Sequence, residues 1–318
     1  MSDKIPVTVI TGYLGAGKTT LLNRILSEKH DKNYAVIVNE FGEIGIDGAL
    51  VVGADEDIFE MSNGCICCSV RGDLIETIDN LLKSGREIDN IIIETTGLAD
   101  PAPVAQTFLQ EEFVRSKTQL DAILTVVDAK HISVELEASR EAKEQIAFAD
   151  ILLLNKIDLV EDVDALETML RAINPLAKIY HTKQSDIDLN LILSQNAFAL
   201  DRTLVKDPEF LSHHHHHHHD DDVQSFSLET DKPMDRQKFS MWMQWVLEHF
   251  GMDMLRTKGI ISFAGYEERF VVQGVHQLIE GVAQRPWGEG EKRVNQLVFI
   301  GRNLPQDIIE DGFYKAQK

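Results

Sequence analysis

The feature that most constrains the fold is the stretch "VTVITGYLGAGKTT", from Val7 to Thr20. A short apolar run precedes the pattern G-x-x-x-x-G-K-[ST], and apolar residues at helical spacing follow it. This strand–loop–helix order is typical of a phosphate-binding P-loop. Glycines let the backbone N–H groups curl around phosphate oxygens, and the helix that follows directs its positive end at the anion. The stretch therefore predicts a nucleotide site on an α/β fold.

Within this loop we expect Lys18 to reach the β- and γ-phosphates and the Thr19 hydroxyl to bind Mg²⁺. Both are candidate catalytic residues. The other candidate nucleotide-binding residues of the loop are Gly12, Gly15, Ala16, Gly17 and Thr20.

Apolar runs alternate with helical patterns over the first 200 residues. Continuous apolar strands separated by helices indicate a mainly parallel sheet covered on both faces, so we predict a P-loop NTPase domain of the α/β class. The runs expected to form its strands are Val7–Ile10, Tyr34–Val38, Asn90–Glu94, Ala122–Asp128, Asp150–Asn155 and Lys178–Thr182.

The pattern breaks at "DPEFLSHHHHHHHDDD", Asp207 to Asp222, which has too few apolar residues to bury a core. We predict a P-loop domain over 1–206, a His/Asp-rich linker over 207–222 and a smaller α+β domain over 223–318. The last has short strands between glycines, a helix over Asp235–Phe250 and a closing helix after Pro305, and its sheet is expected to be antiparallel. His213–His219 form either a loose metal reservoir or an inert or engineered tract.

Two further motifs belong to the nucleotide site. "NKID" (Asn155–Asp158) follows a buried apolar run, where ligands bind in parallel sheets. Asp158 would accept hydrogen bonds from guanine N1–H and the N2 amino group, which adenine lacks, so guanine is expected. In "IIIETTGLADP", Glu94 is a candidate for the Mg²⁺ shell, and Gly97 leaves room for the γ-phosphate. No obvious glutamine or arginine finger stands near this motif, so we expect slow intrinsic hydrolysis.

All three cysteines of the chain fall within "NGCICC", as Cys65, Cys67 and Cys68. Three thiols in four positions can converge on one soft cation, and Zn²⁺ needs a fourth ligand for a closed tetrahedral site. An open position favours exchange over permanent structural binding. A small stapling site and a redox switch are the other interpretations.

Composition excludes several classes of function. The net charge is −21, from 31 basic and 52 acidic residues, which argues against nucleic acid or an anionic membrane as the main partner. No apolar stretch approaches the ~18 residues of a spanning helix, and the first residues do not form a secretory signal. An odd number of closely spaced cysteines suits a reducing compartment, so we expect a cytoplasmic protein.

In order, "GYLGAGKTT", "NEFGEIGID", "NGCICC", "ETTGLADP" and "NKID" resemble the CobW-like family of P-loop GTPases, and "RPWG" (Arg285–Gly288) and "FIG" (Phe299–Gly301) resemble its C-terminal domain. The resemblance covers nearly the whole chain. It implies GTP hydrolysis to GDP and phosphate with Mg²⁺, and GTP-dependent delivery of a metal, in several members Zn²⁺, to client metalloproteins.

By position, the resemblance places Lys18, Thr19 and Glu94 at the phosphate and Mg²⁺ site, and the three cysteines at the metal motif. It also matches Glu40 and Glu43 to acidic positions that support Mg²⁺ or complete the zinc shell, with Glu43 favoured for zinc.

We hypothesise that GTP and Mg²⁺ organise the cysteine site and that hydrolysis loosens it, so that zinc passes to a client protein. One alternative is an activator that delivers cobalt, nickel or iron to a client enzyme of the cobalamin or nitrile hydratase type. Another is a non-catalytic zinc store. A homo-oligomer that depends on nucleotide or metal is compatible with each of these.

Overall fold

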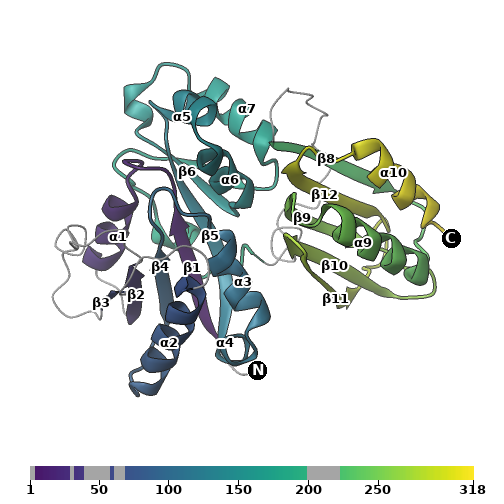
Figure 1. Ribbon diagram of the computed structural model, residues 1–318, viewed down its shortest axis with the longest axis horizontal. Coiled ribbons are helices and arrows are strands. Elements are labelled where there is room, and N and C mark those ends of the chain that lie inside the picture. Colours follow the sequence, from purple (N-terminus) through teal and green to yellow (C-terminus); the bar gives the residue numbers. More distant parts are fainter. Residues whose placement is uncertain (1–3, 29–31, 39–57, 61–68, 199–222) are drawn as a thin grey trace. The chain divides into compact units, whose positions relative to one another are not determined.

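The computed structural model describes residues 4–28, 32–38, 58–60, 69–198 and 223–318 of the chain. These residues form two compact units (Figure 1). The first holds the described residues of Met1–Met169 together with Ala177–Phe198, and the second those of Leu170–Leu176 and Ala199–Lys318. The predicted linker, 207–222, lies outside the described residues.

The first unit is built on a seven-stranded sheet in the order β3-β2-β4-β1-β5-β6-β7, and every strand pair in it is parallel. Its strands are β1 Ile5–Thr11, β2 Tyr34–Val38, β3 Ile58–Glu60, β4 Asn90–Glu94, β5 Thr118–Asp128, β6 Ile151–Asn155 and β7 Lys178–His181. Its helices are α1 Lys18–Ser27, α2 Ser69–Lys83, α3 Ala102–Gln110, α4 Glu112–Lys117, α5 Ile132–Ala138 and α6 Arg140–Phe148, with short 3₁₀ turns at Ile157–Leu159 and Leu189–Leu191. A further helix, α7 Val163–Ile173, begins in this unit, and its residues from Leu170 onward belong to the second.

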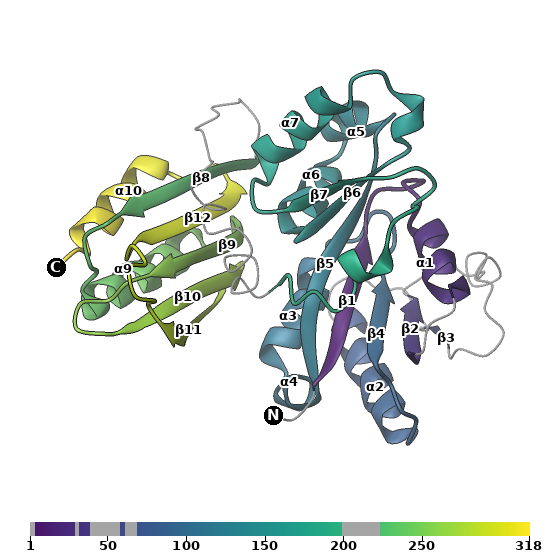
Figure 2. The same cartoon turned by 180° about the vertical axis from the view of Figure 1, so that it is seen from behind.

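Helices cover both faces of this sheet, as the front and back views show (Figures 1 and 2). The strands β2, β4 and β6 are buried along their whole length, as expected for apolar runs between two helical layers. On one face, α1 buries Leu21, Leu22, Ile25 and Leu26 in a core that includes residues of β1, β2 and β5. On the other face, α3 and α6 contact β5.

The register of the strands aligns their carboxyl ends. Glu94 of β4 pairs with Ile10 of β1 and with Val38 of β2, and Val38 in turn pairs with Glu60 of β3. Four strands therefore end at one level, and the P-loop leaves the sheet at this edge.

The second unit is a five-stranded antiparallel sheet in the order β11-β10-β9-β12-β8. Its strands are β8 Val223–Thr230, β9 Met254–Ile261, β10 Glu268–Val275, β11 Leu278–Pro286 and β12 Asn295–Arg302, and its helices are α9 Arg236–Phe250 and α10 Gln306–Lys315. Both helices pack on one face, where Trp242 and Phe313 join a core with Phe299 of the sheet (Figure 1).

The predicted fold class is confirmed: an α/β P-loop domain with a parallel sheet precedes a smaller α+β unit with an antiparallel sheet. Two strands were not predicted. β3 has only three residues, and β11 is an edge strand whose side chains are mostly half-buried or exposed, so neither gives a clear apolar signal. β5 also begins at Thr118 rather than Ala122.

Candidate nucleotide site

The P-loop joins β1 to α1 and has a conformation that only glycine adopts without strain. Gly12, Gly15 and Gly17 have φ values of 140°, 76° and 114°. A Cβ on Gly12 would lie 2.2 Å from the carbonyl oxygen of Val126, and one on Gly17 would lie 2.6 Å from the Asn155 side-chain nitrogen. The loop therefore packs closely against Val126 of β5 and Asn155 of β6, and these two residues support its backbone.

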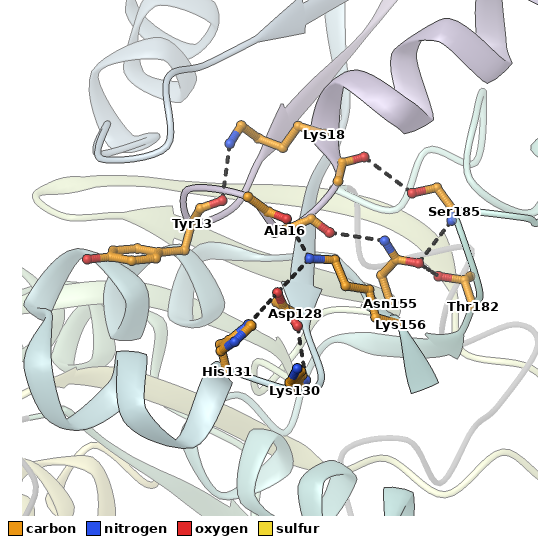
Figure 3. Close-up of polar contacts among 12 residues, drawn as sticks. Tyr13, Ala16, Lys18, Asp128, Lys130, His131, Asn155, Lys156, Thr182 and Ser185 are labelled. Atoms are coloured by element: carbon orange, nitrogen blue, oxygen red, sulfur yellow. Dashed lines mark hydrogen bonds and ion pairs between the residues drawn. The ribbon is translucent and has the colours of Figure 1, made fainter. Parts of the chain in front are cut away.

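Lys18 and Thr19 stand at the first turn of α1, beside the end of β4. The buried Lys18 ammonium donates to the carbonyl oxygens of Gly12 (2.9 Å) and Tyr13 (3.2 Å), so it lies over the loop (Figure 3). The Thr19 hydroxyl donates to the Glu94 carboxylate at 3.3 Å, and Glu94 is itself buried. A hydroxyl and a carboxylate oxygen together suit Mg²⁺, which prefers hard oxygen ligands.

Asn155, the last residue of β6, links three segments. Its amide nitrogen donates to the carbonyl oxygen of Ala16 at 3.0 Å, and its amide oxygen accepts from the Thr182 hydroxyl (3.0 Å) and the Ser185 N–H (2.9 Å). Ser185 also donates through its hydroxyl to the carbonyl oxygen of Gly17 at 3.3 Å (Figure 3). The P-loop and the loop after β7 are thus fastened to one buried amide.

Lys156, the residue after Asn155, has a left-handed backbone conformation with φ 63°. Its ammonium donates to the carbonyl oxygen of Gly15 at 2.8 Å and to the Asp128 carboxylate at 2.7 Å (Figure 3). The lysine side chain therefore spans from β6 to the P-loop. This arrangement leaves its aliphatic part available as a surface for a planar base.

Asp128 ends β5 and is almost fully buried. Burial would raise the pKa of its carboxyl group, but hydrogen bonds from the His131 ring (2.9 Å), from Lys156 and from the N–H of Lys130 (3.0 Å) hold that pKa below its usual value. For nearby Glu135, burial and then the negative charge of Asp128 raise the pKa. Asp128 is thus the ionised partner of Lys156.

The loop that follows Glu94 lies against the P-loop. Thr95 is tied to β1, since its N–H donates to the carbonyl oxygen of Ile10 at 3.0 Å and its hydroxyl donates to the Thr11 hydroxyl at 2.9 Å. A Cβ on Gly97 would lie 2.5 Å from Leu14 Cδ2 and 2.9 Å from Leu14 Cα. A glycine at this position lets the two loops touch.

The structure thus places the predicted P-loop residues, Glu94, Gly97, Asn155 and Lys156 at one edge of the sheet. Asp158 follows in the 3₁₀ turn Ile157–Leu159 with an exposed side chain, and Thr20 is exposed on α1. The predicted metal ligands Glu40, Glu43, Cys65, Cys67 and Cys68 lie outside the described residues, as does His213–His219.

Sequence reasoning did not find Asp128, Thr182 or Ser185. Each stands at or just beyond the carboxyl end of a strand, which is the signal that could have identified them. Among the described residues, no three His, Cys, Asp or Glu side chains converge as a metal site would require. None of the described helices is long and apolar enough to cross a membrane.

A parallel sheet whose central strand leads into a P-loop, with an Asn-Lys pair locked onto that loop, defines a P-loop nucleotide-binding protein of the GTPase class. Residues 6–181 match the family model described as CobW/HypB/UreG, nucleotide-binding domain, and residues 223–317 match the cobalamin synthesis protein cobW C-terminal domain. The chain belongs to the CobW family of P-loop GTPases.

Similar proteins match almost the whole of this chain. The chain is 38% identical over 321 residues to "Zinc chaperone YjiA" of Escherichia coli (strain K12), with 99% of this chain and all of that protein covered. It is 33% identical to "Zinc-regulated GTPase metalloprotein activator 1" of Schizosaccharomyces pombe, over 95% of this chain and 83% of that protein. A crystal structure of Zn(II)-bound YjiA GTPase from E. coli superposes with a TM-score of 0.82, covering 99% of this chain and 100% of that one at 33% identity.

Proposed function

We propose that this protein hydrolyses GTP to GDP and phosphate, and that the bound nucleotide controls when zinc is held at Cys65, Cys67 and Cys68 and when it passes to a client metalloprotein in the cytoplasm. The observation that carries this proposal is the alignment of strand ends at the nucleotide site. Glu94, Val38 and Glu60 lie at one level on neighbouring strands.

The nucleotide half of the proposal uses the residues described above. Lys18 would leave the loop carbonyls for the β- and γ-phosphates, which are stronger acceptors because they are charged. Thr19 and Glu94 would hold Mg²⁺, which neutralises charge that develops on the phosphates. Lys156 would lie against the base, and Asp158 would select guanine through its N1–H and N2 amino groups.

The zinc half of the proposal draws on the cysteine motif and on the relatives. Two proteins that match nearly end to end are named zinc chaperone and zinc-regulated GTPase metalloprotein activator. Three thiolates suit Zn²⁺ and leave one of its four positions for Glu43, water or a residue of the client. This open position would allow transfer.

The path of the chain supports the proposed coupling. Glu60 ends β3 and Ser69 begins α2, so the cysteines connect two elements of the nucleotide-binding unit. β3 lies two strands from β4, which is about 10 Å at the usual strand spacing. Glu60, the last described residue before the cysteine segment, thus lies close to Glu94, where the change from GTP to GDP is proposed to act.

The decisive experiment titrates the metal-free protein with Co²⁺ and Zn²⁺ in the presence of GDP or of a non-hydrolysable GTP analogue. Cobalt–thiolate absorption reports sulfur ligation, and Cys67→Ser should abolish it while GDP affinity stays unchanged. We expect about 5- to 150-fold tighter metal binding with the GTP analogue, and by linkage the same factor for nucleotide affinity when zinc is present. Equal metal affinity in both nucleotide states would exclude coupling and leave a zinc store. A larger effect of nucleotide state on Co²⁺ affinity than on Zn²⁺ affinity would favour an activator that delivers cobalt.

A further inference from the structure

A single glutamine of α6 connects that helix to the loop after β4, which the nucleotide site uses. Gln145 is 1% exposed, and its amide nitrogen donates to the carbonyl oxygens of Gly97 and Ala99, each at 3.1 Å. Its backbone oxygen accepts from the Thr125 hydroxyl of β5 at 2.8 Å, which fixes the base of the side chain.

The orientation of this amide is determined by its partners. Two carbonyl oxygens can only accept, so the group between them must be the NH₂ end of the glutamine. Within the described residues the other end, Oε1, is buried without a hydrogen-bond partner. Glutamate cannot replace this residue, because an ionised carboxylate would face two carbonyl oxygens.

The rest of the loop is fixed at both ends and has one internal bond. Thr95 ties its start to β1, and the N–H of Ala102 donates to the Asp100 carboxylate at 2.8 Å where α3 begins. Between these ends, the N–H of Ala99 donates to the carbonyl oxygen of Thr96 at 3.0 Å. That bond holds the peptide plane that carries the N–H of Gly97, because C=O and N–H of one peptide bond share a plane.

We infer that Gln145 is a positioning residue for the γ-phosphate. It clamps the carbonyls of Gly97 and Ala99, both within the Thr96–Ala99 turn. It thereby fixes the turn that directs the Gly97 N–H and the depth at which Gly97 meets Leu14 of the P-loop. GDP has no phosphate group at this position. Removal of the clamp therefore weakens the binding of GTP and leaves the binding of GDP unchanged.

This inference rests on the proposed role of the Gly97 loop at the γ-phosphate, and it does not involve zinc. Every measurement is therefore made on the zinc-free protein in the presence of Mg²⁺, and a failed test of zinc coupling leaves the inference intact. If the wild type binds no guanine nucleotide at all, the proposed function is wrong. Titration of the wild type alone reveals this, before any variant is compared.

The test compares Gln145→Met, which keeps the length of the side chain and removes the donor, with wild type. Affinities for GDP and for a non-hydrolysable GTP analogue are measured by fluorescence titration, and kcat and KM by phosphate release. We expect GDP affinity within about twofold of wild type, and about tenfold losses of GTP-analogue affinity and of kcat/KM, as for one or two neutral hydrogen bonds.

The matched control is Gln119→Met. Gln119 is an exposed residue of β5 whose amide donates to Asn196 at 2.7 Å, away from the P-loop, so this variant should behave as wild type. Gln145→Asn keeps the amide on a shorter side chain, and it provides the same comparison if the methionine variant does not fold. Equal losses for GDP and the analogue would show a merely structural role. Unchanged affinity for both nucleotides would also overturn the inference.

Discussion

Among single residues, Asp128 carries the buried charge that orients Lys156. It accepts three hydrogen bonds, from Lys156, His131 and the N–H of Lys130, and its low pKa keeps it ionised. Lys156 in turn reaches the carbonyl oxygen of Gly15. Guanine recognition and the P-loop thus share a residue that would contact neither base nor phosphate.

We expect Asp128→Asn to weaken GDP and GTP-analogue binding to the same extent, by about tenfold or more, because hydrogen bonds to charged groups contribute about 1.5–3 kcal/mol. Fluorescence titration with both nucleotides checks this. Asp79→Asn is the control, since Asp79 pairs with Lys83 on the surface of α2 and should leave affinity unchanged. A selective loss of the GTP analogue would contradict the assignment of Asp128 to the base side of the site.

The residues of the site divide by how they could be found. The P-loop, Glu94 and the Asn155-Lys156 pair could be predicted because each belongs to a short contiguous motif whose residue types indicate its chemistry. Gln145 could not, because it lies within helix α6 and acts on Gly97, 48 residues away. Ser185 had only the signal of its position after β7, and its partner Gly17 is 168 residues away. Such pairs exist only once the sheet has set its strand order.

Among the elements, α9 and α10 approach each other closely at one glycine. A Cβ on Gly312 of α10 would lie 2.4 Å from Trp242 Cδ1 and 2.5 Å from its Nε1. Alanine usually stabilises a helix relative to glycine, by roughly 1 kcal/mol. Here the indole ring occupies the space that a methyl group would need.

We therefore expect Gly312→Ala to lower the free energy of unfolding of the second unit by about 1–3 kcal/mol, the usual cost of an overpacked core. All three tryptophans, Trp242, Trp245 and Trp287, belong to this unit, so their fluorescence during urea unfolding reports on it. Gly281→Ala in β11 is the control, because no atom lies within 4 Å of its Cβ position. Equal stability of both variants would contradict this close packing.

The predictability of elements follows their burial. β4 and β6 are apolar and fully buried, and their sequences alone indicated parallel strands. β11 contains Gly281 and Pro286 and pairs only with β10, so its strand character comes from its neighbour. Its turn to β10 uses His276 with φ 51°, a left-handed conformation that apolar periodicity does not reveal.

At the scale of the whole molecule, we expect low pH to destabilise the second unit through protonation of Glu291. The hydrogen bonds from Arg285 lower the pKa of Glu291 to about 2, against the effect of burial, with further contributions from the Gly288 N–H and from Arg269. A carboxyl group whose pKa is lower in the folded than in the unfolded state stabilises the fold above the unfolded value, 4.5. This contribution is lost as the pH falls from there through about 2.

Between pH 5 and pH 3, we expect the free energy of unfolding to fall by about 1 kcal/mol more in the wild type than in Glu291→Gln. This difference is smaller than the pKa shift alone would give, because the ion pair is partly exposed to solvent. Urea unfolding followed by tryptophan fluorescence at both pH values measures this difference. Glu289→Gln changes the same charge at an exposed position nearby and should follow wild type. Parallel pH curves for all three proteins would contradict the role of the ion pair.

The central place of β1 has a consequence for how the protein is made. β1 precedes β4 and β5 in the chain, yet Ile5 of β1 pairs with Thr118 of β5, and Val7 pairs with Ile91 of β4. The nascent P-loop must therefore wait for distant strands before its backbone is supported. Ser185, which fastens Gly17, is synthesised later still. We therefore expect nucleotide capture to be a late event of biosynthesis, although the motif that binds the phosphates is translated before the strands that support it.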